Sequence, residues 1–396
     1  MESSSTPQYP IKNRKAKVTK DNTEGNNIMG VNKTILNTIL FYIFFAQMVC
    51  AQHTAAEDVV TIGLLVNDDT SQAARNAAEL AIHIANKDQG LNGKQFKVVT
   101  RSMEGPWGTG SKEAVNLVFK EKVWALLGSH DGRNAHLAEQ VIAKTRVVFI
   151  SAWASDPTLS QAYIPWFYNC VPNDIQQAEA LVNEIVHVQK ANTIAIVVQE
   201  DYDAKTALKY LEKQLMDKGG PKPLIQSFTQ CLDHTGEFIG ELRNKAVEAL
   251  IILGNGEESW ELMGVLRKNG VKLPFYGTIP LLGVRGLSRP ERGGPSDLTV
   301  LYSGNWLKTN TLQSQHGAVG RDAISNAVAA YTFDAMNVLI NAIKASGFDR
   351  DKIYGTMSKT DFEGVTGNVQ FDKNGNRRSD LKLVKIAKED TTSQKQ

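Results

Sequence analysis

The chain has 396 residues, of which 22% are charged, and its formal net charge at neutral pH is +2. This length is sufficient for more than one hydrophobic core, and a hydrophobic content of 42% is typical of globular proteins. The basic residues are scattered rather than gathered in runs, so the chain lacks the charge pattern of a nucleic-acid-binding protein. We therefore expect a globular protein with no nucleic-acid partner.

Residues 29–51 have the pattern of a secretory signal peptide. Lys33 precedes the apolar stretch Ile35–Val49, and small residues suited to cleavage follow it. The apolar stretch is shorter than the roughly 20 residues that a helix needs to cross a bilayer. We expect cleavage after Ala51, which would leave an exported chain that does not span the membrane.

The ends of this segment raise two further points. In the alternative to signal-peptide cleavage after Ala51, Cys50 would be the modified residue of a lipoprotein, although the residues before it match such a processing site poorly. Residues 1–28 are polar and rich in lysine, with nothing to pack, so we expect them to be an upstream extension and translation to start at Met29.

The exported chain retains two cysteines, Cys170 and Cys231, in a compartment where a disulfide can persist. Their spacing does not decide whether they pair. Neither belongs to a Cys-x-x-Cys pattern, so structural zinc and thiol redox chemistry are not expected.

Strand-like and helix-like stretches alternate along the chain, which is typical of parallel sheets covered by helices. In chain order we expect strand Val59–Val66, helix Ala73–Asp88, strand Lys97–Ser102, helix Gly110–Lys120, strand Val123–Leu127, a helix with Ala138, Val141 and Ile142 on one face, strand Val147–Ile150, helix Gln177–Gln189, strand Thr193–Val198, helix Ala204–Lys218, strand Leu224–Phe228, helix Glu237–Lys245, strand Ala249–Leu253, helix Ser259–Asn269 and strand Phe275–Gly277. The restart at Gln177 predicts a second doubly wound unit.

The last part of the chain breaks this tandem pattern. Leu298–Asn305 is strand-like, Arg321–Ser346 is helical, Val369–Gly375 has the pattern of a hairpin, and Leu381–Ile386 is a further strand. We expect the chain to return to its first unit. The predicted fold class is α/β, with two doubly wound parallel-sheet lobes joined by a hinge and a cleft between them.

The loops that follow the strands around residues 123–150 are the first candidates for a site. One loop follows Val123–Leu127, and Ser151–Pro157 follows the next strand with an indole, two hydroxyls and small residues. In open α/β sheets, ligands bind outside the carboxyl ends of the strands. Both loops therefore lie where a ligand is expected.

Several motifs in chain order resemble the type I periplasmic binding proteins of the leucine/isoleucine/valine-binding group. The matching features are Ile62-Gly63, Asn86–Gly93, Leu127-Gly128-Ser129, Ile150-Ser151, Asp156–Leu159, Asp201-Tyr202, Gly254, Leu266-Arg267, Gly270, Gly364–Asp372 and Gly375. The resemblance covers nearly the whole exported chain. It implies a periplasmic receptor that closes on a small ligand and presents it to the membrane permease of an ABC transporter, without catalysis.

The resemblance also implies the extent of the lobes. Lobe 1 would comprise residues 57–170 and 306–377. Lobe 2 would comprise residues 171–305 and 380–391.

In this family, backbone N–H groups and hydroxyls of lobe 1 hold a ligand carboxylate. The matching positions are Gly132, Trp153, Ala154 and Ser155, of which Ser155 keeps a hydroxyl and Gly132 does not. Arg133 would supply a charge-assisted partner for the same carboxylate.

In lobe 2, Tyr202 matches a family aromatic that covers the ligand, and Asn255, Gly256 and Thr278 complete the pocket. The family acid that holds an α-ammonium falls at Ile279. A buried ammonium without a carboxylate partner is costly. The expected ligand is therefore a small, partly apolar carboxylate. Ligands without the α-amine, such as aliphatic or aromatic acids or amides, fit Ile279 better than leucine does, and the alternative is an amino acid held by Glu257 or Asp201.

Other classes of function have weaker support in the sequence. His130, Asp131 and His136 fall short of a dedicated metal site, and Gly105–Lys112 departs from a phosphate-binding loop at its lysine. There is no Gly-x-Ser-x-Gly elbow. We expect no metal, no cofactor and no enzymatic activity, and the alternative to transport is a module that reports ligand occupancy to a signalling receptor.

Overall fold

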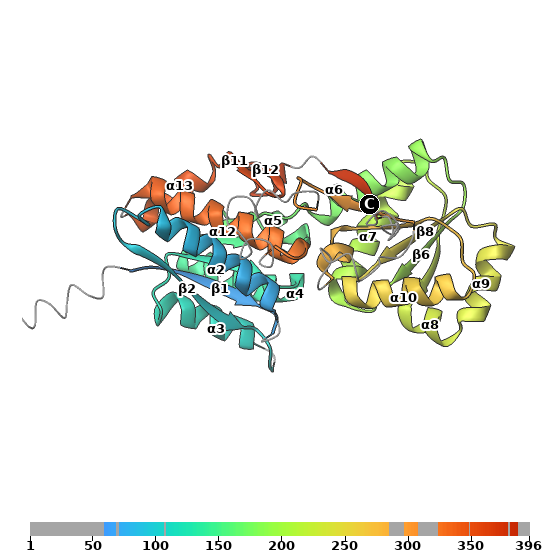
Figure 1. Ribbon diagram of the computed structural model, residues 1–396, viewed down its shortest axis with the longest axis horizontal. Helices are drawn as coiled ribbons and strands as arrows, with labels where there is room; N and C mark the ends of the chain where they lie inside the picture. The colour runs from blue at the N-terminus through green and yellow to red at the C-terminus, as the bar shows by residue number, and fades with distance from the viewer. Residues whose placement is uncertain are drawn as a thin grey trace, which may run out of the picture. The chain divides into compact units, whose positions relative to one another are not determined.

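The computed structural model describes residues 59–68, 71–106, 108–284, 297–307, 324–347, 349–378 and 381–386. The expected signal peptide and the residues before it lie outside these ranges. Helices and mainly parallel strands alternate, so the chain is α/β (Figure 1). Within the described ranges, no helix combines the length and apolar character that crossing a membrane requires.

The first sheet contains five parallel strands in the order β2-β1-β3-β4-β5. These are β1 (Val59–Val66), β2 (Gln95–Ser102), β3 (Ala125–Ser129), β4 (Phe149–Ser151) and β5 (Phe167–Asn169). Helices α2 (Gln72–Lys87) and α12 (Ala327–Ser346) pack together on one face, and α3 (Thr109–Phe119) and α4 (Gly132–Thr145) on the other. Every residue of β3 is buried, as expected for a strand covered on both faces.

The second sheet has the order β14-β10-β9-β8-β6-β7. Its strands are β6 (Ile194–Val198), β7 (Leu224–Ser227), β8 (Ala249–Leu253), β9 (Phe275–Gly277), β10 (Leu298–Tyr302) and β14 (Lys382–Ile386). The helices in this part are α6 (Asp174–Val182), α7 (Tyr202–Asp217), α8 (Phe228–Asp233), α9 (Thr235–Asn244) and α10 (Gly256–Lys268). Strand β14 runs antiparallel to β10, so the sheet is parallel except at this edge.

Short elements complete the fold. They are α5 (Thr158–Gln161), the π-helix η1 (Asn183–Val188), the 3₁₀ helices η2 (Ile279–Gly283) and η4 (Arg350–Lys352), α13 (Ile353–Met357), β11 (Phe362–Gly364), β12 (Gly367–Phe371) and β13 (Arg377–Arg378). The predicted hairpin is confirmed, because β12 pairs antiparallel with β13 across it.

Side-chain caps explain where the structure departs from the predicted element boundaries. The helix predicted from Gln177 begins at Asp174, because Asn173 and Gln176 form a capping box. The strand predicted to reach Phe228 stops one residue earlier, because Ser227 caps α8. Such caps are short-range features that an apolar run does not reveal.

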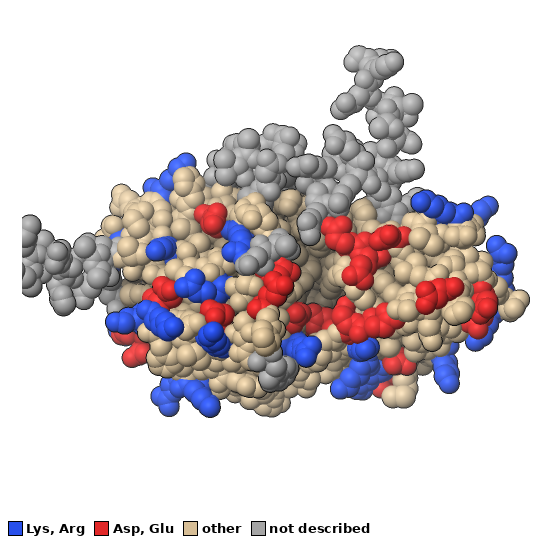
Figure 2. All heavy atoms as spheres, turned by 90° about the horizontal axis from the view of Figure 1, so that it is seen from below, with Lys and Arg blue, Asp and Glu red and all other residues tan. Residues whose placement is uncertain are grey.

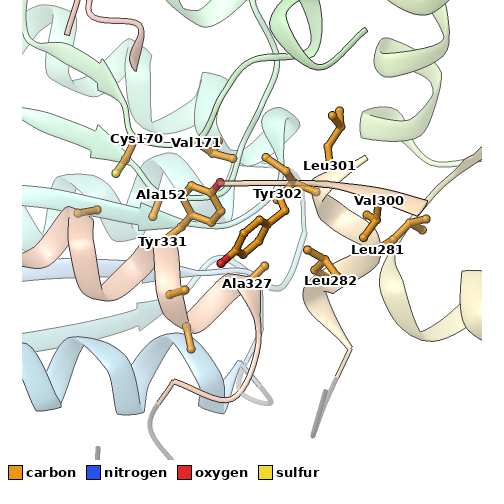
Figure 3. Close-up of a cluster of buried hydrophobic side chains, with 14 of the residues drawn as sticks. Ala152, Cys170, Val171, Leu281, Leu282, Val300, Leu301, Tyr302, Ala327 and Tyr331 are labelled. Atoms are coloured by element: carbon orange, nitrogen blue, oxygen red, sulfur yellow. The ribbon is translucent and has the colours of Figure 1, made fainter. Parts of the chain in front are cut away.

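One hydrophobic core continues from the first sheet to the second. In Figure 3, Ala152 and Cys170 beside the first sheet lie near Tyr331 of α12, and Tyr302 of β10 and Leu282 of η2 lie on the other side of it. The hydroxyls of Tyr331 and Ser303 are 2.6 Å apart within this core. Packing thus connects the chain segments that pass between the sheets. The lobe boundaries expected from the sequence remain predictions.

Candidate functional site

A cavity of about 800 Å³ lies at the carboxyl ends of strands from both sheets. Residues that line it follow β1, β3 and β4 of the first sheet and β6, β8 and β9 of the second; examples are Asn67, Asp131, Trp153, Asp201, Asn255 and Thr278. This is the position where open α/β sheets bind ligands, and the volume is within the range of about 300–1,000 Å³ that is usual for small-molecule pockets.

Five helices begin at this cavity, namely α4, α6, α7, α10 and α12, and three of the side-chain caps lie after strands of the two sheets. Asp131 accepts a hydrogen bond from the N–H of Asn134 at 2.7 Å, which fixes the start of α4. Asp201 accepts from Ala204 at 2.8 Å at the start of α7. Asn255 accepts in the same way at the start of α10. The caps hold the helix N-termini in place and leave adjacent side chains beside the cavity.

Two hydrogen bonds join the loops of the first sheet to the first turn of α7. The Gly132 N–H donates to Asp203 Oδ1 at 2.9 Å, and the Tyr202 hydroxyl donates to Asp156 Oδ2 at 2.7 Å. Each bond therefore joins the part of the wall beside the first sheet to the part formed by α7.

Asp156 is also held by His136, whose Nε2 lies 3.0 Å from Asp156 Oδ2. Hydrogen bonds to Asp156 and Glu139 raise the pKa of His136 to about 9. Burial raises the pKa of Asp156, but hydrogen bonds from His136, Tyr202 and Thr158 outweigh it and lower the pKa to about 2. At neutral pH, His136 and Asp156 therefore form an ion pair beside the cavity.

Two carboxyl groups on the cavity wall have raised pKa values. Burial, with the nearby charges of Asp131, Asp201 and Asp156, raises the pKa of Asp203 to about 7, although the Gly132 N–H opposes the shift. Burial also raises the pKa of Asp174 well above its ordinary value, against a hydrogen bond from the Ser155 hydroxyl. Carboxyl groups are thus crowded at this part of the wall.

Seven of the ten residues predicted for the site line the cavity, namely Arg133, Trp153, Ser155, Tyr202, Asn255, Gly256 and Thr278. Trp153 lies against the backbone of Gly283, where an added Cβ would come within 3.3 Å of the indole. Asp201 and Glu257, the acids considered as partners for an ammonium group, also line the cavity.

The remaining three predicted residues, Gly132, Ala154 and Ile279, do not contribute to the lining. The N–H of Gly132 is bonded to Asp203, and Ala154 is fully buried. Ile279 begins η2, is 1% exposed, and donates its N–H to Gln177 Oε1 at 3.0 Å. Ile279, where the resemblance in sequence places the family acid, is therefore packed inside the protein.

The sequence reasoning missed several acidic residues on the wall, including Asp174, Glu200, Asp203 and Glu258. Glu200 and Asp203 flank the predicted Asp201-Tyr202 pair after β6, so their place after a buried strand was the available signal. No such signal marked Asp174, because it follows the irregular segment between β5 and α6 and not a predicted strand.

A metal site and thiol chemistry receive no support from the described residues. Among these residues, no group of three or more His, Cys, Asp and Glu side chains is arranged to hold a metal ion. Cys170 and Cys231 are both free and buried, so they are not joined. Burial raises the pKa of each thiol to about 12, which leaves them without nucleophilic thiolate at neutral pH.

Comparison with known proteins places the chain in a class. The model of the periplasmic binding protein family matches residues 60–391. The branched-chain amino acid transporter substrate-binding protein LivJ of Streptococcus pneumoniae, solved with isoleucine, has 19% identity and a TM-score of 0.70, over 83% of this chain and 97% of that chain. An ABC transporter solute-binding protein of Rhodopseudomonas palustris, solved with 3,4-dihydroxybenzoic acid, has 15% identity and a TM-score of 0.69, over 84% and 94%.

The chain belongs to the periplasmic binding protein family. It is also similar to glutamate receptor 3.4 of Arabidopsis thaliana, with 28% identity over 145 residues, which is 36% of this chain and only 15% of that receptor. At identities of 19% and 15%, the two solved structures show that this chain shares their fold, that of type I periplasmic binding proteins with two lobes.

Proposed function

We propose that this protein is the exported solute-binding subunit of an ABC importer and captures a small amino-acid-like ligand in the cavity. The observation that carries the proposal is that residues from the ends of both sheets line one cavity of about 800 Å³. Its membership of the periplasmic binding protein family supports the same conclusion. The protein would act in the periplasm, and its partners would be the ligand and a membrane permease.

The proposed mechanism is a hinge motion that brings the two walls onto the ligand. Trp153 and Ser155 would contact it from one wall, and Tyr202, Asn255 and Thr278 from the other. A ligand that touches both walls binds the closed arrangement more tightly than the open one, and this difference drives closure.

The side chains on the wall favour a ligand with both an amine and a carboxylate. Arg133 and Ser155 are suited to the carboxylate. Asp201 and Glu257 would hold the ammonium group that Ile279 cannot hold. We therefore favour an amino acid over an acid without the amine, and Trp153, Ala207 and Val328 supply the apolar part of the wall.

A thermal-shift screen tests this proposal. The exported protein, unfolded and refolded to remove carried-over ligand, is screened against α-amino acids and against matched carboxylic acids without the amine. Stabilisation by amino acids is the expected result. Stabilisation by the amine-free acids alone would overturn the ligand class, and stabilisation by neither set would contradict small-molecule capture.

The second candidate function is a sensory module that reports ligand occupancy to a receptor. The similarity to a stretch of glutamate receptor 3.4 favours it. A transport subunit should stimulate ATP hydrolysis by its permease in reconstituted vesicles when ligand is present. Ligand-dependent association with a receptor, without any effect on transport, would favour sensing.

Recovery of the bound compound distinguishes binding from catalysis. After prolonged incubation with the protein, mass spectrometry should find the compound unchanged. A chemical product would contradict both candidate functions.

A further inference from the structure

Acidic side chains dominate the described part of the cavity wall. Eight of the 22 lining residues are Asp or Glu, whereas Arg133 is the basic one. Figure 2 shows Asp and Glu side chains gathered in a band across the middle of one face of the molecule. A wall of this composition repels a second carboxylate and attracts cations.

Asp174 is the acidic residue on this wall that is hardest to explain as surface charge. It lines the cavity but is only 5% exposed. The Ser155 hydroxyl donates to its carboxyl group, and no lysine or arginine of the described residues forms an ion pair with it. Asp174 is the first residue of α6, so the positive end of the helix offsets part of its charge, and burial favours its neutral form. A cation from outside the chain, bound beside it, would favour the carboxylate instead.

Asp203 gives a second, independent reason. Its Oδ1 accepts from the Gly132 N–H, and the residue lines the cavity. Its raised pKa reflects burial and the like charges of Asp131, Asp201 and Asp156. A cation between these groups would relieve that repulsion.

The local structure offsets only part of this charge. Asp131 and Asp201 cap helices, and the N-terminus of each of the five helices that begin here, α4, α6, α7, α10 and α12, carries roughly +0.5 charge. Together with Arg133, these helix ends supply about +3.5, and the raised pKa values of Asp174 and Asp203 remove up to two negative charges. Acidic side chains still outnumber basic ones among the described residues of the wall.

We propose that the cavity binds a ligand with two cationic amino groups separated by an aliphatic chain. This chemistry is shared by basic amino acids such as lysine and by diamines such as cadaverine. The carboxylates of Asp174 and Asp203 would hold one cationic group and those near Asp201 the other, and Trp153 would cover the chain between them. The inference rests on the proposed function and specifies its ligand.

Isothermal titration calorimetry with four matched compounds tests the inference. Lysine has both amino groups, norleucine lacks the ε-amine, 6-aminohexanoate lacks the α-amine, and cadaverine lacks the carboxylate. We expect lysine or cadaverine to bind at least about tenfold more tightly than norleucine and 6-aminohexanoate, a difference of about 1.4 kcal/mol. Tighter binding of lysine would identify a basic amino acid, and tighter binding of cadaverine a diamine.

The outcomes separate this inference from the proposed function. Norleucine binding as tightly as lysine, or binding only of other amino acids from the thermal-shift screen, would overturn the inference and leave solute capture standing. Binding of no compound in either experiment would overturn both.

A matched pair of variants tests the role of Asp203. Asp203→Asn keeps an acceptor for the Gly132 N–H but removes the charge, and we expect about tenfold weaker binding of the dication with little change for norleucine. The control is Asp217→Asn, which removes the same charge at the far end of α7, where Asp217 pairs with Lys213. Equal effects in both variants, or none in Asp203→Asn, would contradict the inference.

Discussion

Asp156 shows how one buried side chain connects the two walls of the cavity. It is 2% exposed and accepts hydrogen bonds from Tyr202 and His136 and from both the N–H and the hydroxyl of Thr158. Tyr202 is on α7, whereas His136 and Thr158 belong to elements beside the first sheet. Changes at either partner should therefore be measurable as changes in stability.

Tyr202→Phe should lower the free energy of unfolding by about 1 kcal/mol, because it removes a hydrogen bond to a carboxylate at a partly exposed position. Chemical denaturation measures the effect. The control is Tyr163→Phe, at a residue that is 72% exposed, which should leave stability unchanged. Equal stability of the Tyr202 variant and the wild-type protein would show that this bond contributes nothing.

His136→Gln should destabilise the protein more at pH 6 than at pH 9.5. The pKa of His136 is raised to about 9 in the folded protein, so its contribution is fully present below its ordinary pKa of 6.5 and is lost as the pH rises through 9. The pKa of Asp156 is lowered to about 2, so its contribution persists throughout this window. Melting temperatures of both proteins across the pH range measure the difference.

The control is the same substitution at His187, an exposed residue of η1. A destabilisation by His136→Gln that does not change with pH would contradict the ion pair.

At the scale of elements, the caps at the helix starts shape the cavity wall. Asn255→Ala should lower the free energy of unfolding by about 1 kcal/mol, because the first turn of α10 loses its cap. Asn255→Asp keeps the acceptor and should remain near the wild-type value. Denaturation followed by circular dichroism compares the variants, and equal losses in both would rule out capping as the cause.

Elements were predictable where an apolar run or a helical period was long. The strands Val59–Val66 and Ala249–Leu253 have the predicted bounds. The three-residue strand Phe275–Gly277 was also predicted with its bounds, but β5 and α8 were missed, because three to six residues give no clear period and their boundaries depend on caps and tertiary packing.

At the scale of the whole molecule, Arg377 connects segments that are distant in sequence. It is 2% exposed and donates to the backbone oxygens of Cys170, Thr366, Gly367 and Asn368 and to the Thr366 hydroxyl. Cys170 directly follows β5, so these bonds fasten β13 beside the point where the chain leaves the first sheet.

Arg377→Met should lower the free energy of unfolding by about 3 kcal/mol, because several buried carbonyl groups lose their donor. The control is Arg378→Met at the adjacent exposed residue, which should change stability little. Denaturation midpoints compare the two variants. A loss below 1 kcal/mol at Arg377 would mean that water replaces its hydrogen bonds.

The position of the cavity was more predictable than the composition of its wall. The rule for strand ends located the loops around Trp153 and Tyr202, and both residues line the cavity. Ile279 does not line the cavity, because its side chain packs inward at the start of η2. The acidic wall arises from residues far apart in sequence, such as Asp174 and Glu258, which only the fold brings together.

The central claim is that one small molecule binds in this cavity, and equilibrium dialysis of the best compound from the thermal-shift screen tests it most directly. We predict one molecule bound per chain, and loss of binding in Ala207→Trp, which would fill the cavity from α7. Met216→Trp on the same helix, at a residue that is 74% exposed, should bind as the wild-type protein does. Undiminished binding by the folded Ala207→Trp protein would contradict the assignment of the ligand to this cavity.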